Sequence, residues 1–306
     1  MAITAAQVKE LREATGAGMM DCKKALVETD GDMAKAVDYL RENGLAKAAK
    51  KAGRIAAEGL VKLAFNADGT NAAAVEVNAE TDFVAKNDEF VQFVDDCAKL
   101  ALTAADEDME KFMALTLGEQ GTVQETLTAK IAKIGENMNV RRIAKGNTAG
   151  CKYVGYVHGG GKIGVIIGLK TEATAEEVAV VGKDVAMQAA SMRPLYVDES
   201  GVDPEYIAHE KEVLVAQAAN ESPNKPKEII EKMITGRLKK QLKEVCLVEQ
   251  SFVKNGDMTV KEYVDSVAKE IGKPIQVVEM IRYEVGEGLE KKVENFAEEV
   301  AKQMQG

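Results

Sequence analysis

Apolar residues recur at helical spacing in three short runs near the start of the chain. In the first run, Thr4 and Gln7 form the pattern of a capping box, which bonds the free N–H groups of a starting helix, and Gly16 suits the helix end. The second run predicts a helix over Met20–Thr29, and the third predicts a helix that ends at Gly44. These three helices would form a bundle whose core is too small to be very stable alone.

A basic stretch follows the predicted bundle. Between Gly44 and Arg54 the charged residues are Lys47, Lys50, Lys51 and Arg54, with no acidic residue among them. The stretch is either a helical linker or a basic contact surface, and the pattern leaves both interpretations open.

A strand, a turn and a second strand come next, and the same series recurs later in the chain. Alternating apolar residues over Gly59–Asn66, a turn at Asp68–Gly69 and a returning apolar run predict a β-hairpin that is followed by a helix. The second copy comprises Tyr153–His158, a glycine-rich turn and Ile163–Thr171, again with an apolar helical stripe after it. The core of the protein therefore has the pattern of a duplication.

A longer match supports this duplication. Thr122–Gly135 aligns without gaps to Thr259–Gly272 at an offset of 137 residues, with five of the 14 positions identical. Each match is followed by a strand-like run, Met138–Ile143 in the first copy and Ile275–Val285 in the second. Each copy thus reads as a hairpin, two helices and a third strand.

Together these patterns predict an α+β fold. It consists of a three-helix bundle with its linker (residues 1–54), a duplicated core of small antiparallel sheets with helices (55–150 and 151–285), an inserted antiparallel helical hairpin at about 195–250, and a C-terminal helix module (286–306). The last helix rests on apolar positions at 4-3-4 spacing, Leu289, Val293, Phe296 and Val300. It either packs on its own core or docks a partner.

Proline marks the insert in the second copy. Four of the five prolines lie between residues 194 and 226, and the patterns on either side of Pro223 predict helices over Pro204–Asn220 and Pro226–Val245. Seven basic residues and two acidic ones occupy Lys225–Lys243. The resulting arm is either a solvated element or a docking surface for an acidic partner.

The first copy carries an extra loop. Seven residues separate Thr81 from Glu89, whereas four separate the equivalent Thr171 and Glu176. The extra residues must bulge outward, because the elements on either side are fixed by packing. The bulge contains Phe83, whose ring is either tucked back into the core or presented to another molecule.

Composition and charge exclude several classes of protein. The net charge of −10, the absence of tryptophan and an aromatic fraction of 5% argue against direct nucleic-acid binding. The longest apolar stretch, Ile163–Leu169, is far shorter than the roughly 20 residues that span a bilayer. The start of the chain has no pattern of a secretory signal, and four widely spaced cysteines suit neither a disulfide framework nor a metal site. We expect a cytoplasmic protein without a membrane partner.

The sequence offers no persuasive catalytic site. Gly159–Gly164 has the spacing of a dinucleotide fingerprint, but a strand rather than a helix is predicted after it, so a hairpin turn is the better interpretation. The only histidines are His158 and His209, which makes a histidine-based triad or metal site hard to assemble. His158 shares a face with Val154 and Tyr156, and a structural role or a surface contact is favoured for it.

Five segments resemble a known family. They are TGAGMMDCKKAL (Thr15–Leu26), TDFVAKN (Thr81–Asn87), IGENMNVRR (Ile134–Arg142), the strand Tyr156–His158 with the following KIGV, and RYEVGEGLEKK (Arg282–Lys292). Taken together and in this order, they are similar to translation elongation factor Ts over essentially the whole chain, the helical hairpin included. Two departures are Ser251, where the family usually has proline, and an unusually glycine-rich turn at 159–161.

The resemblance implies a guanine-nucleotide exchange factor for elongation factor Tu. It implies an N-terminal domain like the ubiquitin-associated domain and a duplicated dimerisation core, and it allows a homodimer or a heterotetramer with the partner. No covalent chemistry, cofactor or metal of its own is expected. Bacterial and organellar origins both remain open.

The resemblance also implies the partner contacts. Two adjacent methionines on a helix cannot both face one small core, so at least one is expected outside. The implied mechanism is that the bulged loop wedges an aromatic ring into the partner beside its Mg²⁺ and bound GDP, which weakens nucleotide binding. The contact residues are Arg12, Met19 and Met20 in the bundle, Thr81, Asp82, Phe83 and Val84 in the bulged loop, and His158 in the second copy.

Two other functions stay open. An adaptor built on the three-helix bundle would bind a ubiquitin-like partner without affecting any nucleotide. An enzyme that used the glycine-rich turn would bind a nucleotide by itself.

Overall fold

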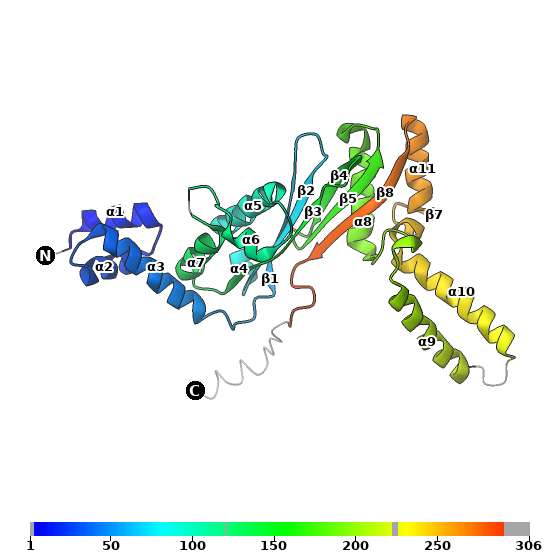
Figure 1. The fold of residues 1–306 in the computed structure, drawn as a ribbon, viewed down its shortest axis with the longest axis horizontal. Helices are drawn as coiled ribbons and strands as arrows, with labels where there is room; N and C mark the ends of the chain where they lie inside the picture. The colour runs from blue at the N-terminus through cyan, green and yellow to red at the C-terminus, as the bar shows by residue number, and fades with distance from the viewer. Residues whose placement is uncertain (1–2, 120, 222–225, 291–306) are drawn as a thin grey trace. The chain divides into compact units, whose positions relative to one another are not determined.

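The computed structural model describes residues 3–119, 121–221 and 226–290 of the chain (Figure 1). Its helices and small antiparallel sheets confirm the predicted α+β class. The described residues form two compact units, the first made of residues 3–62, 75–144 and 283–290, and the second of residues 63–74 and 145–282. The predicted domain bounds remain predictions.

The chain begins with the predicted three-helix bundle. Helices α1 (Ala5–Thr15), α2 (Met19–Glu28) and α3 (Met33–Ala49) surround a small core that includes Leu11 and Leu26, both fully buried. The capping box at Thr4 is present with both of its bonds, and Gly16 ends α1 in the left-handed conformation at φ 66°. Local sequence signals therefore placed the first helix correctly.

The prediction that the third helix ends at Gly44 is wrong. α3 continues to Ala49, and Gly44 is buried inside it. A Cβ at Gly44 would lie 3.7 Å from the Cβ of Ala132 in α7 (Val123–Ile134), so the glycine allows close approach of the two helices. It is a packing residue rather than a cap.

The basic stretch is helical as far as Ala49, in agreement with the linker interpretation. Two of its cations have acidic partners within the first unit. The Lys47 Nζ lies 2.9 Å from Asp21, and Arg54 lies 3.4 Å from Glu80. These pairs tie the linker to both the bundle and the following sheet.

The first sheet has the strand order β1-β2-β3, formed by β1 (Glu58–Phe65), β2 (Ala72–Ala79) and β3 (Met138–Gly146). Every residue of β2 is buried. Between the hairpin and β3 lie α4 (Asp82–Ala85), α5 (Asp88–Thr103), α6 (Met109–Ala114) and α7. The short α6, which packs against α7, has no counterpart in the prediction.

The second sheet repeats this plan with the order β4-β5-β8. The strands β4 (Cys151–His158) and β5 (Ile163–Thr171) are antiparallel, with His158 opposite Ile163, and β8 spans Ile275–Glu284. Helix α8 (Ala175–Met192) packs across β4 and β5, and α11 (Val260–Ile271) packs against α8 (Figure 1).

The two matched helices also begin and end alike. Helices α7 and α11 each start with a threonine–glutamate capping box, and Gly135 and Gly272 end them at φ 92° and 75°. Because the same caps stand at the same places in both copies, the structure supports the duplication read from the sequence.

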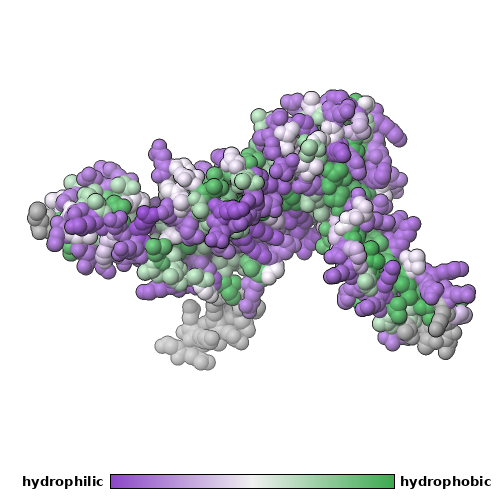
Figure 2. Space-filling view, in the orientation of Figure 1, coloured by the Kyte–Doolittle hydropathy of each residue, from purple (hydrophilic) through white to green (hydrophobic). Residues whose placement is uncertain are grey.

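The predicted helical arm is present in the second copy. After the short η1 (Glu199–Gly201), α9 (Pro204–Glu221) and α10 (Lys227–Val245) lie side by side (Figure 1), joined by an ion pair of 2.7 Å between Arg237 and Glu221. Apolar side chains gather along this arm in Figure 2. The elements η2 (Leu247–Glu249), β6 (Ser251–Phe252) and β7 (Asn255–Thr259) lead back to α11. The docking of an acidic partner by this arm stays a prediction.

The predicted C-terminal helix lies almost wholly outside the described residues. Of its apolar positions only Leu289 is described, and it is 37% exposed.

Gly59 in the first sheet is a position where substitution is expected to lower the stability strongly. Gly59 has φ 138°, and a Cβ there would come 2.1 Å from the carbonyl oxygen of Val77. We expect Gly59→Ala to destabilise the first unit by about 3 kcal/mol or more, since backbone strain and overpacking each cost about 1–3 kcal/mol. Urea unfolding followed by circular dichroism measures this change.

Gly135→Ala is the matched control, because Gly135 also has a positive φ but nothing lies within 4 Å of the added Cβ. A loss of stability no larger than that of the control would show that the strand can shift to accept the methyl group.

Candidate functional site

The bulged loop of the first copy is a single helical turn, α4. Thr81 is its N-cap, and the Thr81 hydroxyl oxygen accepts a hydrogen bond of 3.3 Å from the Val84 N–H. The same hydroxyl donates to Glu136 over 2.7 Å. The extra residues therefore form an ordered and capped structure.

The turn presents its aromatic ring to solvent. Phe83 is 80% exposed, whereas Val84 and Ala85 on the inner side are 7% and 5% exposed. The interpretation that the Phe83 ring is tucked into the core is therefore wrong, and its contact with another molecule stays a prediction. The side chain of Val84, which the resemblance also implies as a contact residue, is buried and anchors the turn in the free protein, and its contact with a partner stays a prediction.

A charged pair lies beside the exposed ring. Asp82 is partly buried, and its carboxylate lies 2.6 Å from the Lys86 ammonium group one turn later. Exposed pairs of this kind contribute only about 0–1 kcal/mol. A partner could therefore take over one of these charges at small cost.

The bundle presents a second apolar surface. Met19 and Met20, in the first turn of α2, are 59% and 73% exposed, and Arg12 on α1 is also exposed. The bundle core is filled by other residues, among them Cys22, Ala25 and Leu26. We expected at least one methionine outside the core, and the structure places both there.

His158 lies at the end of β4 in the second unit, where it is exposed. The Tyr156 hydroxyl lies 2.9 Å from the His158 Nδ1, so both side chains share one face of the strand as the alternation predicts. Thr81, Asp82, Phe83, Arg12 and both methionines belong to the first unit.

The glycine-rich turn after His158 is a hairpin turn. Gly159, Gly160 and Gly161 all have positive φ, and β5 begins at Ile163 without an intervening helix. A dinucleotide fingerprint requires a helix at this point. The preference for a turn over a phosphate cradle is confirmed.

Among the described residues, no cluster of three or more histidine, cysteine or acidic side chains could hold a metal ion. Within the same residues, no helix combines the length and the apolar character needed to cross a membrane.

The four cysteines Cys22, Cys97, Cys151 and Cys246 are free thiols and all are buried. Burial raises the pKa of each thiol, for Cys97 from its ordinary value of 9.0 to about 12. Because the thiolate is the reactive form, we expect slow reaction of all four with a thiol reagent at about pH 8 in the folded protein. A colorimetric count should give four fast thiols in denaturant; rapid reaction of Cys97 in the folded protein would contradict its burial.

The first unit contains a buried charge network that was not predicted from the sequence. Glu76 in β2 is fully buried, and its carboxylate lies 3.1 Å from Arg141 and 2.6 Å from Arg142, both in β3. It also accepts hydrogen bonds from the Asn78 amide and from the Gly286 N–H, over 3.0 and 2.8 Å. A signal was available, because a lone glutamate interrupts the apolar run of β2.

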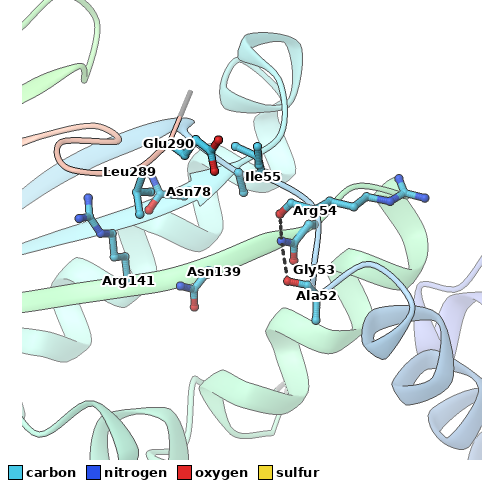
Figure 3. A pocket seen from close by; sticks show the side chains of 11 residues that line it. Ala52, Gly53, Arg54, Ile55, Asn78, Asn139, Arg141, Leu289 and Glu290 are labelled. Carbon is cyan, nitrogen blue, oxygen red and sulfur yellow. Dashed lines mark hydrogen bonds between the residues drawn. The ribbon is translucent and has the colours of Figure 1, made fainter. Parts of the chain in front are cut away.

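This network also holds the segment after β8. The guanidinium groups of Arg141 and Arg142 donate to Glu287 over 2.6 and 3.3 Å, and Arg142 lies 4.0 Å from the centre of the Tyr283 ring. A cavity of about 300 Å³ lies next to it, lined by Asn78, Arg141 and other residues shown in Figure 3. Two of the segments that resemble the family, one with Arg141 and Arg142 and one with Gly286, therefore both contact Glu76.

Comparison with known proteins identifies the family. A family model described as "Elongation factor TS" matches residues 80–287, which is more than half of the chain. The chain belongs to the elongation factor Ts family. It is 60% identical over 302 residues to elongation factor Ts of Clostridioides difficile (strain 630), with 99% of both chains covered. It is 54% identical over 304 residues to elongation factor Ts of Clostridium novyi (strain NT), again with 99% of both covered.

Membership of the elongation factor Ts family makes this protein a translation elongation factor. The matched residues 80–287 include the α4 turn and His158. Arg12, Met19 and Met20 precede that match, but the relatives cover 99% of this chain. A third relative, elongation factor Ts of Clostridium tetani (strain Massachusetts / E88), is 52% identical over 305 residues and covers 99% of this chain and 100% of its own.

Proposed function

We propose that this protein is the guanine-nucleotide exchange factor of elongation factor Tu. It binds elongation factor Tu in its GDP form and promotes release of the nucleotide, without covalent chemistry and without a cofactor of its own. We place this activity in the cytoplasm, where bacterial translation runs, and base that placement on the family.

The observation that carries the proposal is the exposed ring of Phe83 on a capped turn. A phenylalanine buries on the order of 150–250 Å² when it enters a partner. Leaving it 80% exposed in the free protein costs hydrophobic free energy that docking regains. A wedge must also hold its shape, and the anchors Val84 and Ala85 together with the Thr81 cap supply that rigidity.

The proposed mechanism is displacement of the partner's Mg²⁺ site. Mg²⁺ requires near-ideal octahedral geometry, so a small shift of its ligands weakens both metal and phosphate binding. We propose that Phe83 inserts beside that site while Asp82 leaves Lys86 and disturbs the polar groups around the metal. The factor and the nucleotide then lower each other's affinity by the same ratio.

The bundle and the second copy supply docking contacts in this proposal. Met19 and Met20 offer flexible apolar side chains, which adapt well to a partner surface, and Arg12 offers a cation on α1 of the same bundle. His158 contributes a contact from the second unit. These residues bind the partner, and the α4 turn acts on its nucleotide site.

The experiment is release of a fluorescent GDP from elongation factor Tu, followed by stopped flow against excess unlabelled GDP. We expect a rate that rises with the concentration of this protein, and no binding of the nucleotide by this protein alone. Binding to elongation factor Tu without faster release would support the adaptor alternative instead. Saturable nucleotide binding by the chain itself would support the enzyme alternative.

A further inference from the structure

The loop between α7 and β3 holds the α4 turn in place. The Glu136 carboxylate accepts two hydrogen bonds from Thr81, one from the backbone N–H over 3.0 Å and one from the hydroxyl over 2.7 Å. The hydroxyl in turn accepts from the Val84 N–H. The bonds form a relay from the Phe83 turn through its N-cap to one carboxylate.

The next residue in the same loop holds the linker of the three-helix bundle. The Asn137 side-chain amide donates to the carbonyl oxygens of Arg54 and Ala52 over 2.7 and 3.5 Å, shown as dashed lines in Figure 3. The Asn137 backbone N–H donates to the Glu80 carboxylate over 2.6 Å, and Arg54 pairs with Glu80 as well.

The segment at Glu80–Thr81 and the loop at Glu136–Asn137 hold each other through hydrogen bonds in both directions. A carboxylate before the turn, Glu80, holds the loop, and a carboxylate of the loop, Glu136, holds the turn. All of these residues belong to the first unit. A single loop therefore contacts both the α4 turn that carries Phe83 and the linker that leads to Met19 and Met20.

The end of α7 does not itself need Glu136. Gly135 already caps the helix in the left-handed conformation, and its N–H donates to the Ile131 carbonyl over 3.0 Å. Hydrogen bonds to a charged acceptor are among the strong ones, and here both are made by the N-cap of α4. The two bonds to this carboxylate therefore serve the turn rather than the helix before it.

We infer that Glu136 and Asn137 are positioning residues for nucleotide exchange. Glu136 fixes the Phe83 turn, and Asn137 fixes the linker of the bundle, so that both contact surfaces are set before the partner binds. Such preorganisation lowers the ordering cost of association. This inference rests on the proposed function for its effect on exchange, but its structural part is tested on the protein alone.

The structural part is tested with a single fluorophore. The chain has no tryptophan, so Phe83→Trp supplies one reporter at the site. We expect the time-resolved anisotropy of this introduced tryptophan to show greater local motion when Glu136→Gln is added. Each carboxylate oxygen of Glu136 accepts one bond from Thr81, whereas the glutamine side chain has only one acceptor oxygen and no charge. Unchanged anisotropy would overturn the role of Glu136 whatever elongation factor Tu does.

Glu262→Gln is the matched control. Glu262 in α11 accepts the same pair of bonds from its own N-cap, with the Thr259 N–H at 2.7 Å and the Thr259 hydroxyl at 3.2 Å. It belongs to the second unit, whereas the reporter belongs to the first. We expect its substitution to leave the anisotropy of the reporter unchanged. An equal effect of both substitutions would point to general loosening and overturn the proposal.

The functional part is tested by double-mutant cycles in the GDP-release assay. We expect Glu136→Gln to lower the stimulated rate about tenfold, since a displacement of about 1 Å can cost up to about a hundredfold, and to add little once Phe83 is alanine. Asn137→Ala should instead raise the concentration needed for half-maximal stimulation and couple to Met20→Ala. Additive effects of the two substitutions in both cycles would overturn the role of Glu136 and Asn137 as positioning residues. If the wild-type protein does not stimulate GDP release at all, the proposed function itself is refuted.

Discussion

Replacing Phe83 by alanine is expected to remove most of the proposed acceleration of GDP release from elongation factor Tu. The ring is 80% exposed, so its loss leaves no cavity in the free protein. Aromatic residues at the centre of an interface typically contribute about 2–4 kcal/mol. If that free energy acts on the displaced nucleotide site, the stimulated rate falls by roughly 30- to 1,000-fold at a fixed concentration of the factor, with each factor of ten equal to about 1.4 kcal/mol.

Stopped-flow release of fluorescent GDP measures this loss. Val180→Ala is the matched control, since Val180 is an apolar residue that is 71% exposed and lies on α8 outside the candidate contacts. We expect the control to keep the wild-type rate and both variants to keep the wild-type melting temperature. Full stimulation by Phe83→Ala would remove the wedge from the mechanism.

Replacing Glu76 by alanine is expected to give the largest loss of stability. The substitution leaves the guanidinium groups of Arg141 and Arg142 without the carboxylate that both contact. Removal of one partner from a buried ion pair costs about 3–5 kcal/mol. The two arginine side chains are 22% and 28% exposed, and Arg142 keeps the half-exposed Glu287 as a partner, so we expect about 3 kcal/mol here. The Gly286 N–H and the Asn78 amide lose an acceptor as well, which adds to the cost.

Urea unfolding of the full chain measures this change. Glu287→Ala is the control, because the Glu287 carboxylate meets Arg142 at 3.3 Å but is 47% exposed, and such pairs contribute about 0–1 kcal/mol. A Glu76→Ala protein as stable as the control would mean that water replaces the carboxylate and that the network does not hold the sheet and the following segment together.

The elements that the sequence predicted well are those that local chemistry decides. The capping box at Thr4 predicted the start of α1, because a hydroxyl and a carboxamide satisfy the free N–H groups within one turn. The duplication was predicted from the repeated strand and helix patterns and from the match between Thr122–Gly135 and Thr259–Gly272, which the structure shows as helices with the same caps. The helical arm followed from its prolines and its apolar stripe.

The features that could not be predicted from the sequence depend on contacts between residues that are distant along the chain. Gly44 has the local signal of a helix end, but its role comes from Ala132 on another helix. The ring of Phe83 could have been inside or outside until the inner positions of the turn were seen to be occupied by Val84 and Ala85. The clamp of Glu136 on Thr81 joins residues 55 positions apart, and no local pattern pairs them.

Reciprocal binding tests the account most directly. The affinity of this protein for elongation factor Tu would be measured by titration calorimetry, once with nucleotide-free partner and once with partner saturated by GDP and Mg²⁺. We predict tighter binding to the nucleotide-free form, by the same ratio by which this protein weakens GDP binding. Equal affinity for both forms would contradict the claim that it acts by displacing the nucleotide.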